Sequence, residues 1–309
     1  MYHYVRKIQE SRYPGIKGLE LDLFKKQLSF LKQNGFSFAT VEDIKNGKVS
    51  DKSVLLTFDD GYIDHYSNVF PILLENNIQG VFSMPAKIIR EKKVLDVNKI
   101  HYTLAVADKN LLLSRLCQRM DHYRGSEHDY PSNRELYDKW AKANRFDDQD
   151  TIFIKRMLQV VLPEKIRNII TDELFREFVT DCEEKFVDEL YMNMEQIDVM
   201  KNNGMFFAYH GYDHDWMTSL NEKDLREDVT NALEVFDGVL NPKNWCCCYP
   251  YGRYNDAVIN VIKDMGATMG IAINGKPYRP ARDSIFEVSR LDTNDFPPKS
   301  ENYKNYTVV

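Results

Sequence analysis

Two adjacent carboxylates follow an apolar run in the first quarter of the sequence. The run Val54–Phe58 has the composition of a buried strand, and Asp59, Asp60 and Gly61 come directly after it. Neighbouring carboxylates can divide the work at a site, because one can bind a cation while the other stays free as a base. The plain alternative is a solvated turn, since Asp-Gly is a common turn pair.

Two imidazoles follow a second apolar run. His210 and His214 come directly after Met205–Tyr209, and they are two of only seven histidines in the chain. Imidazoles four residues apart can meet on one side of a turn and bind one metal ion. Asp213 and Asp215 flank His214, where solvation or support of the histidines is the expected role. Together with the Asp-Asp pair, the histidines favour a metal site over two structural histidines.

A third run, Trp245–Tyr249, leads into a turn. Pro250 and Gly252 would shape a loop whose backbone amides face a site, although Pro-Tyr-Gly is also an ordinary turn. Three consecutive cysteines, 246–248, lie within this run. Successive residues of a strand point to opposite faces, so they cannot chelate one ion as a CxxC pair does. With Cys117 and Cys182 isolated, we interpret all five cysteines as free thiols.

The elements that would position these residues alternate along the chain. Short apolar runs, typical of strands, occupy 54–58, 80–84, 205–210, 245–249, 269–273 and 286–291, and helical patterns separate most of them. Such alternation predicts a mainly parallel sheet or an α/β barrel. Leu21–Asn34 is predicted to be an amphipathic helix. Ser219 and Glu222 fit a capping box that begins another helix.

The pattern changes in the middle of the chain. Between residues 96 and 204 strand signals nearly vanish, and helical segments are predicted at 98–124, 134–144, 151–161, 164–181 and 184–203. The sequence therefore predicts an α/β barrel domain over 1–95 and 205–309, with an all-helical insertion over 96–204. Such an insertion can act as a lid, pack passively or make a dimer contact.

Composition excludes several classes of protein. The 309 residues carry a net charge of −6, which argues against a dedicated nucleic-acid binder. No apolar run reaches the length of a transmembrane helix, and the first residues lack the apolar core of a signal peptide. We therefore expect a cytoplasmic protein without a transmembrane segment. The oligomeric state is unknown from the sequence.

The three motifs together resemble the polysaccharide deacetylases, carbohydrate esterase family four. The family shows Thr-Phe-Asp-Asp-Gly, then His-x3-His, then a Pro-Tyr-Gly loop, and this chain has them in that order at 57–61, 210–214 and 250–252. Tyr2–Val5 and Phe38–Asp43 are also similar to segments of many members. The resemblance covers roughly 1–95 and 205–297, and it implies a distorted, incomplete (β/α) barrel.

The resemblance also implies roles for individual residues. One divalent metal ion, most often Zn²⁺, would be held by Asp60, His210 and His214. Asp59 would be the general base, and the backbone N–H of Tyr251 would hold the oxyanion. Further contacts with the substrate would come from Tyr62, Pro250, Gly252 and Arg290.

The chain departs from the family in two places. No histidine follows His214, so the family's C-terminal Leu-x-x-His proton donor is missing. Substitutes are water at the metal or one of His3, His101, His122, Asp292 and Asp295. Cys248 stands where the family commonly has an arginine that positions the base. Arg290, after a late apolar run, is predicted to supply that guanidinium.

The expected activity is removal of an N-acetyl group from an amino-sugar intermediate of surface-glycan biosynthesis. A helical lid would suit a small or end-on substrate, and a nucleotide-linked or lipid-linked acylated amino-sugar is the expected partner. Three alternatives stay open. They are a deformylase of a formamido sugar, a catalytically silent carbohydrate-binding protein on the same fold, and a hydrolase of a non-sugar amide such as a cyclic ureide.

Overall fold

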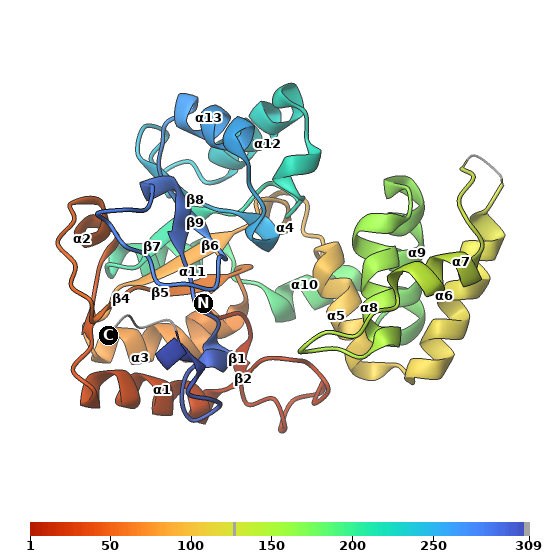
Figure 1. Ribbon diagram of the computed structural model, residues 1–309, viewed down its shortest axis with the longest axis horizontal. Helices are drawn as coiled ribbons and strands as arrows, with labels where there is room; N and C mark the ends of the chain where they lie inside the picture. The colour runs from red at the N-terminus through yellow and green to blue at the C-terminus, as the bar shows by residue number, and fades with distance from the viewer. Residues whose placement is uncertain (126–127, 306–309) are drawn as a thin grey trace. The chain divides into compact units, whose positions relative to one another are not determined.

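The computed structural model describes residues 1–125 and 128–305, and it divides the chain into two compact units (Figure 1). The first, here the α/β unit, comprises Met1–Lys7, Gly18–Lys93 and the chain from Val187 onward. The second, the helical unit, comprises Ile8–Lys17 and Val94–Phe186. Residues 126–127 and 306–309, which fall within the two predicted domains, lie outside the described residues.

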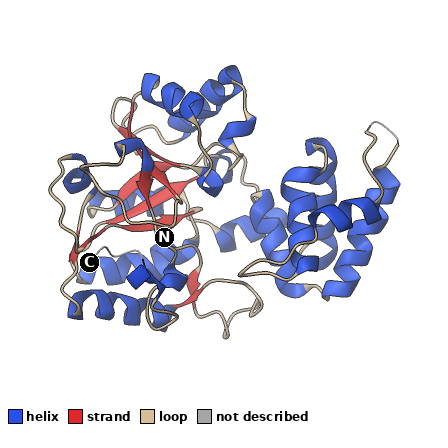
Figure 2. Cartoon of the chain, viewed as in Figure 1, coloured by secondary structure: helices blue, strands red, loops and turns tan. Residues whose placement is uncertain are grey.

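A six-stranded sheet forms the centre of the α/β unit (Figure 2), and all its neighbouring strands are parallel. The strands are β5 (Leu56–Asp59), β6 (Gly80–Met84), β7 (Phe206–Tyr209), β8 (Trp245–Cys248), β9 (Ala267–Ala272) and β10 (Val288–Ser289). Their order in the sheet, β5 to β10, is their order in the chain. With helices around it, this sheet forms a half-barrel, which confirms the predicted incomplete α/β barrel.

Helices connect the strands and cover the sheet. In the α/β unit they are α1 (Leu21–Gln33), α2 (Val41–Lys45), α3 (Phe70–Glu75), α4 (Lys87–Arg90), α11 (Met194–Asn202), α12 (Glu222–Val235) and α13 (Asp256–Asp264). Shorter helical turns are η1 (His65–Val69), η3 (Met217–Ser219), η4 (Pro250–Gly252), η5 (Ile285–Glu287), η6 (Thr293–Asp295) and η7 (Asn302–Asn305). Helix α1 buries Phe24, Leu28 and Leu31, the face that the sequence pattern predicted.

The capping box predicted for α12 is wrong by two residues. The Oγ of Ser219 donates to the carbonyl of Trp216 at 2.7 Å and ends η3, so Ser219 does not cap α12. Asn221 is the cap instead, and its side chain accepts a hydrogen bond from the backbone N–H of Asp224 at 3.0 Å. A tight turn therefore intervenes between the second histidine and the helix.

Short strand pairs extend the α/β unit beyond the central sheet. They are β1 (Val5–Arg6) with β2 (Leu19–Glu20), and β3 (Ser37–Phe38) with β4 (Ser53–Val54). Ahead of β1, Tyr2 forms a parallel bridge with Phe58 of β5. The Tyr2 N–H donates to the Thr57 carbonyl at 2.8 Å, and the Asp59 N–H donates to the Tyr2 carbonyl at 3.0 Å. This pairing holds the start of the chain against the end of β5.

Each unit has its own apolar core. In the α/β unit, Val81, Ala208, Met269 and Ile271 of neighbouring strands pack with Cys246 and Cys248 on the sheet. In the helical unit, a separate cluster is centred on the fully buried Leu112, Leu116, Phe153, Met157 and Ile170. All five cysteines are free thiols, as predicted, and those at 246–248 are buried.

Among its described residues, the helical unit contains no strand of the central sheet and is built mainly from helices. They are α5 (Asp96–Val106), α6 (Lys109–Tyr123), α7 (Asn133–Trp140), α8 (Gln149–Arg156), η2 (Met157–Val161) and α9 (Glu164–Phe178). Helix α10 (Glu183–Leu190) begins in this unit and ends in the α/β unit. Among the helices described, none is both long and apolar enough to cross a membrane.

Candidate metal centre

The candidate site lies at the carboxyl ends of neighbouring parallel strands. Asp59 is the last residue of β5, His210 follows β7, and Cys248 is the last residue of β8. Strands β5 to β8 are consecutive in a parallel sheet, so these ends meet at one edge. The sheet therefore brings together residues that lie nearly two hundred positions apart in the sequence.

The three predicted metal ligands form a buried cluster. One ligand atom from each of Asp60, His210 and His214 lies within 4.8 Å of the others. The Oδ1 of Asp60 is 3.5 Å from Nε2 of His210 and 3.4 Å from Nε2 of His214. Among the described residues this oxygen has no hydrogen-bond partner, which is a costly arrangement for a buried carboxylate. Two imidazole nitrogens therefore face one carboxylate oxygen, and this set of three donor atoms fits a divalent cation.

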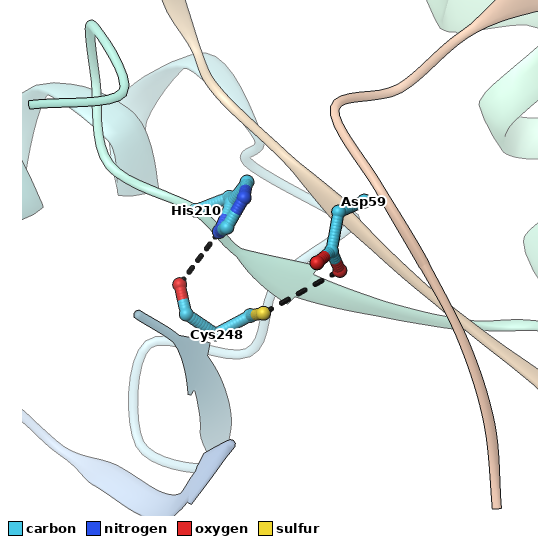
Figure 3. Close-up of side chains that lie close together, drawn as sticks. All are labelled: Asp59, His210 and Cys248. Atoms are coloured by element: carbon cyan, nitrogen blue, oxygen red, sulfur yellow. Dashed lines mark hydrogen bonds between the residues drawn. The ribbon is translucent and has the colours of Figure 1, made fainter. Parts of the chain in front are cut away.

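Each of two ligands is oriented by a hydrogen bond from its other end. The hydroxyl of Tyr62 donates to Oδ2 of Asp60 at 2.6 Å. The Nδ1 of His210 lies 2.7 Å from the carbonyl oxygen of Cys248, as Figure 3 shows. A carbonyl can only accept, so Nδ1 carries a proton and Nε2 is the ring nitrogen that faces Asp60. This is the arrangement by which proteins orient metal-binding histidines.

The second carboxylate is held apart from the cluster. The Oδ1 of Asp59 accepts hydrogen bonds from Ser83 Oγ at 2.7 Å and from Arg290 Nη1 at 2.8 Å. It also accepts one from Cys248 Sγ at 3.5 Å, which Figure 3 shows. Burial alone would raise the pKa of Asp59, but the charges of Arg290, His210 and His3 hold it well below its usual value. Asp59 is therefore an ionised carboxylate at neutral pH.

The two histidines differ in their electrostatic surroundings. Burial lowers the pKa of His214 to about 3, so its imidazole is neutral at pH 7. Burial also acts to lower the pKa of His210, but contacts with Cys248 and Asp60 outweigh it and raise that pKa. A neutral imidazole is the form that binds a metal ion.

One of the predicted substitutes for the missing proton donor lies at the site. The Nε2 of His3 is 3.9 Å from Oδ2 of Asp59, and its side chain is 40% exposed. Its backbone carbonyl accepts a hydrogen bond from Nε2 of the buried His65 at 2.9 Å. Asp292, in contrast, uses its side chain to cap η6, where it accepts from the backbone and side chain of Asn294. His101 lies on α5 of the helical unit and stays a prediction.

The residues predicted to contact substrate are placed in different ways. Tyr62 is fully buried and holds Asp60, so its hydroxyl supports the cluster rather than facing a ligand. Pro250 is also buried, whereas Tyr251 and Gly252 are half-buried in the turn η4. Arg290 is buried and donates to Asp59, and its role in positioning that carboxylate stays a prediction.

Backbone strain concentrates at this site. Asp60, His214 and Tyr251 have φ angles of 77°, 59° and 55°, in the left-handed region that non-glycine residues rarely adopt. Among the described non-glycine residues, only Asn77 and Lys92 share this conformation. Such strain persists where surrounding structure enforces it, and it gathers at functional sites.

Sequence reasoning missed two groups of the site. Ser83, which donates to Asp59, is a polar residue near the end of the apolar strand β6, and that placement was the available signal. Trp216 stacks on Tyr251, with ring centroids 4.7 Å apart and an interplanar angle of 17°. Nothing in the local sequence indicates that stack, because it joins the loops after two different strands.

Comparisons by sequence match part of the chain to a known family. A family model described as polysaccharide deacetylase matches residues 46–111 and 175–270. YxkH of Bacillus subtilis (strain 168), assigned by name to the polysaccharide deacetylases, is 30% identical over 97 residues, which is 30% of this chain and 33% of YxkH. That match therefore spans about a third of the relative's length.

Solved structures resemble the whole chain. The Streptococcus pyogenes deacetylase PplD, in complex with acetate, matches with a TM-score of 0.60 and 17% identity over 100% of this chain and 96% of that chain. IcaB from Ammonifex degensii matches with a TM-score of 0.56 and 18% identity over 99% and 95%. At these identities the structures show a shared fold.

Proposed function

Because this chain belongs to the polysaccharide deacetylase family, we propose that it is a metal-dependent hydrolase that removes an N-acetyl group from an amino-sugar. The observation that carries the proposal is the buried Asp60–His210–His214 cluster with an ionised Asp59 beside it. A binding protein would need neither the base nor the arginine that holds it. Zn²⁺ is the cation we propose first, because two imidazoles and one carboxylate are common zinc ligands.

The chain's own residues would carry the proton transfers. When bound by Asp60, His210 and His214, the cation would polarise the acyl oxygen and lower the pKa of water near Asp59. Asp59 would take the proton of the attacking water, most directly on Oδ2, since Ser83 and Arg290 bind Oδ1. The backbone N–H of Tyr251 would stabilise the oxyanion.

We propose His3 as the general acid. It is the candidate that lies within 3.9 Å of Asp59, and its partial exposure leaves it open to a ligand. The bridge between Tyr2 and Phe58, together with the hydrogen bond from His65, supports a fixed position for it. A protonated His3 would donate to the departing amine, which an amide needs in order to leave.

The substrate and the compartment belong to the same proposal. We propose an intermediate of surface-glycan biosynthesis, linked to a nucleotide or a lipid carrier, processed in the cytoplasm. The helical unit would act as a lid or groove wall that favours a small or end-on substrate. Assays with acetylated nucleotide sugars and with acetylated oligosaccharides separate these substrates.

Acyl release and metal content test the proposal together. We expect the wild type to release acetate, and to hold about one zinc-like ion per chain by mass spectrometry. The Asp59→Asn variant should retain the metal and lose on the order of 10²–10⁴ in rate, the usual contribution of a general base. His210→Ala/His214→Ala should lose both metal and activity.

Other outcomes would contradict the proposal. Release of formate from a formamido sugar, without acetate from the acetylated one, would replace the deacetylase by a deformylase. Sugar binding without release of either acid, in wild type and Asp59→Asn alike, would leave a silent binding protein. A metal-free wild type that stays metal-free after reloading would remove the hydrolytic mechanism.

A further inference from the structure

A row of rings and one guanidinium extends away from the candidate ligand His214. The ring of Tyr251 meets the imidazole of His214 edge-on, with centroids 4.6 Å apart. Trp216 stacks on Tyr251, and the guanidinium carbon of Arg253 lies 5.7 Å from the centre of the Trp216 ring. The loops after β7 and β8 supply all four residues, so the row begins at the cluster itself.

Arg253 carries a charge that no carboxylate neutralises among the residues the structure describes. Three other arginines of the α/β unit have such partners: Arg6 pairs with Asp64, Arg290 with Asp59 and Arg226 with Glu222 and Asp264. Arg253 differs from these three in lying beside the candidate site without such a partner among the described residues. Arg253 is exposed, and its guanidinium contacts an aromatic face instead. That contact orients the guanidinium and leaves its five N–H donors for a ligand.

The backbone fixes where this charge stands. Tyr251 and Gly252 both have left-handed φ angles, 55° and 66°, and the Arg253 N–H donates to the Pro250 carbonyl at 3.2 Å. The turn therefore closes at Arg253. Because the same turn contains Tyr251, the guanidinium and the residue proposed to hold the oxyanion are positioned by one rigid piece of backbone.

We propose that Arg253, oriented by Trp216, forms a subsite for an anionic group on the substrate, a phosphate or a carboxylate near the acylated sugar. The inference rests on the proposed function and narrows its substrate to an anionic saccharide. A guanidinium binds both oxyanions in a bidentate manner, and such charge-assisted hydrogen bonds are strong. In a chain of net charge −6, an unpaired arginine beside the site also offsets repulsion of an anionic ligand.

Calorimetric titration tests the subsite without turnover. The protein is zinc-loaded Asp59→Asn, and the ligands are N-acetylglucosamine, its 1-phosphate and N-acetylmuramic acid, which carries a carboxylate. We expect one or both anionic ligands to bind about tenfold more tightly than the neutral sugar, a typical effect of a charged hydrogen bond. Adding Arg253→Gln should remove this preference, Arg253→Lys should keep part of it, and Trp216→Leu should weaken it.

A matched control and two contrary results complete the test. Arg226→Gln makes the same change in net charge at a guanidinium that is already ion-paired, and it should keep the preference. Equal affinity for neutral and anionic ligands, or a preference that survives Arg253→Gln, would overturn the subsite. Acetate release is measured separately, on the wild type. If the wild type released no acetate but the protein still preferred anionic ligands, the proposed function would be refuted and the subsite would stand.

Discussion

Three chemically important side chains of the site, Asp59, Asp60 and His210, are each held by neighbouring groups. Arg290 and Ser83 hold Asp59, Tyr62 holds Asp60, and the carbonyl of Cys248 holds His210. The first set of residues is visible in the sequence, because their types and their positions after apolar runs indicate chemistry. The holding residues are much less visible. A carbonyl has no side-chain signature, and the only signal for Ser83 is a polar residue near the end of an apolar strand.

Loss of Arg290 should destabilise the protein far more than loss of an exposed arginine. Arg290→Met leaves the Asp59 carboxylate buried without its counter-charge, so we expect the free energy of unfolding to fall by about 3–5 kcal/mol. Turnover should fall with it. Denaturant titration measures the change, and Arg226→Met, at an exposed ion pair, should cost much less.

The double variant Asp59→Asn/Arg290→Met is the discriminating control for that prediction. Because it removes the buried carboxylate together with its partner, it should recover part of the lost stability. If it were no more stable than Arg290→Met alone, the ion pair would not be the cause.

Tyr62→Phe should weaken metal binding while leaving the fold intact. The substitution removes the hydrogen bond to Asp60 Oδ2 and keeps the ring that stacks on Tyr4 and Tyr191. Loss of such an orienting bond typically lowers metal affinity about 10–100-fold. Competition with a chromophoric chelator measures the affinity. Tyr249→Phe, whose hydroxyl donates instead to the Phe286 carbonyl, is the matched control and should leave metal affinity near wild type.

At the scale of elements, strands of the central sheet are predictable and short pairs are not. The predicted run 80–84 has the same bounds as β6. The predicted runs 205–210 and 245–249 differ from the bounds of β7 and β8 by at most one residue at each end. Two-residue strands such as β1 and β3 have no periodicity to detect. The predicted helix at 98–124 is two helices, because Asp108 caps α6 by accepting from the Leu111 N–H at 2.9 Å.

The turn η4 offers a paired test of local packing. Gly252 and Gly275 both have left-handed φ angles, 66° and 62°. A Cβ on Gly252 would lie 2.7 Å from Cβ of Ile273, whereas one on Gly275 meets nothing within 4 Å. Gly275→Ala should therefore cost only the backbone strain, about 1–2 kcal/mol. Gly252→Ala should cost a further 1–3 kcal/mol or so from overpacking.

Thermal denaturation and acetate release distinguish these two glycine variants. We expect the lower Tm and the lower rate in Gly252→Ala, because the turn carries Tyr251 and Arg253. Equal effects of the two substitutions would show that contact with Ile273 does not constrain the turn.

At the scale of the whole molecule, the chain contains two cores. Residues 8–17 belong to the helical unit, although most of that unit lies far later in the chain. No pattern in the sequence predicts that assignment. Segments far apart in the chain can share a core only through tertiary packing, which single-sequence periodicity does not report. The sequence does indicate which stretches are helical, because amphipathic spacing is local.

Metal removal should lower the thermal stability of the α/β unit and leave that of the helical unit unchanged. A ligand stabilises only the structure that binds it, by about 2.7 kcal/mol when its concentration is a hundredfold above Kd. We expect zinc to raise the calorimetric transition of the α/β unit by several degrees and a chelator to reverse this. The transition of the helical unit should stay where it is. In His210→Ala/His214→Ala, a zinc-dependent shift of the same size would contradict the assigned ligands.

The order of strands in the sheet has a consequence for synthesis of the chain. From β5 to β10 each new strand can add to an edge that already exists, but β6 ends at Met84 and β7 begins at Phe206. While the ribosome makes the intervening residues, the edge of β6 that pairs with β7 has no partner strand. All five residues of β6 are buried in the finished protein. An unpaired apolar edge is where nascent chains aggregate. The helical unit, with its local contacts, can fold during this interval. We therefore expect β6 to be the segment most prone to aggregation during synthesis.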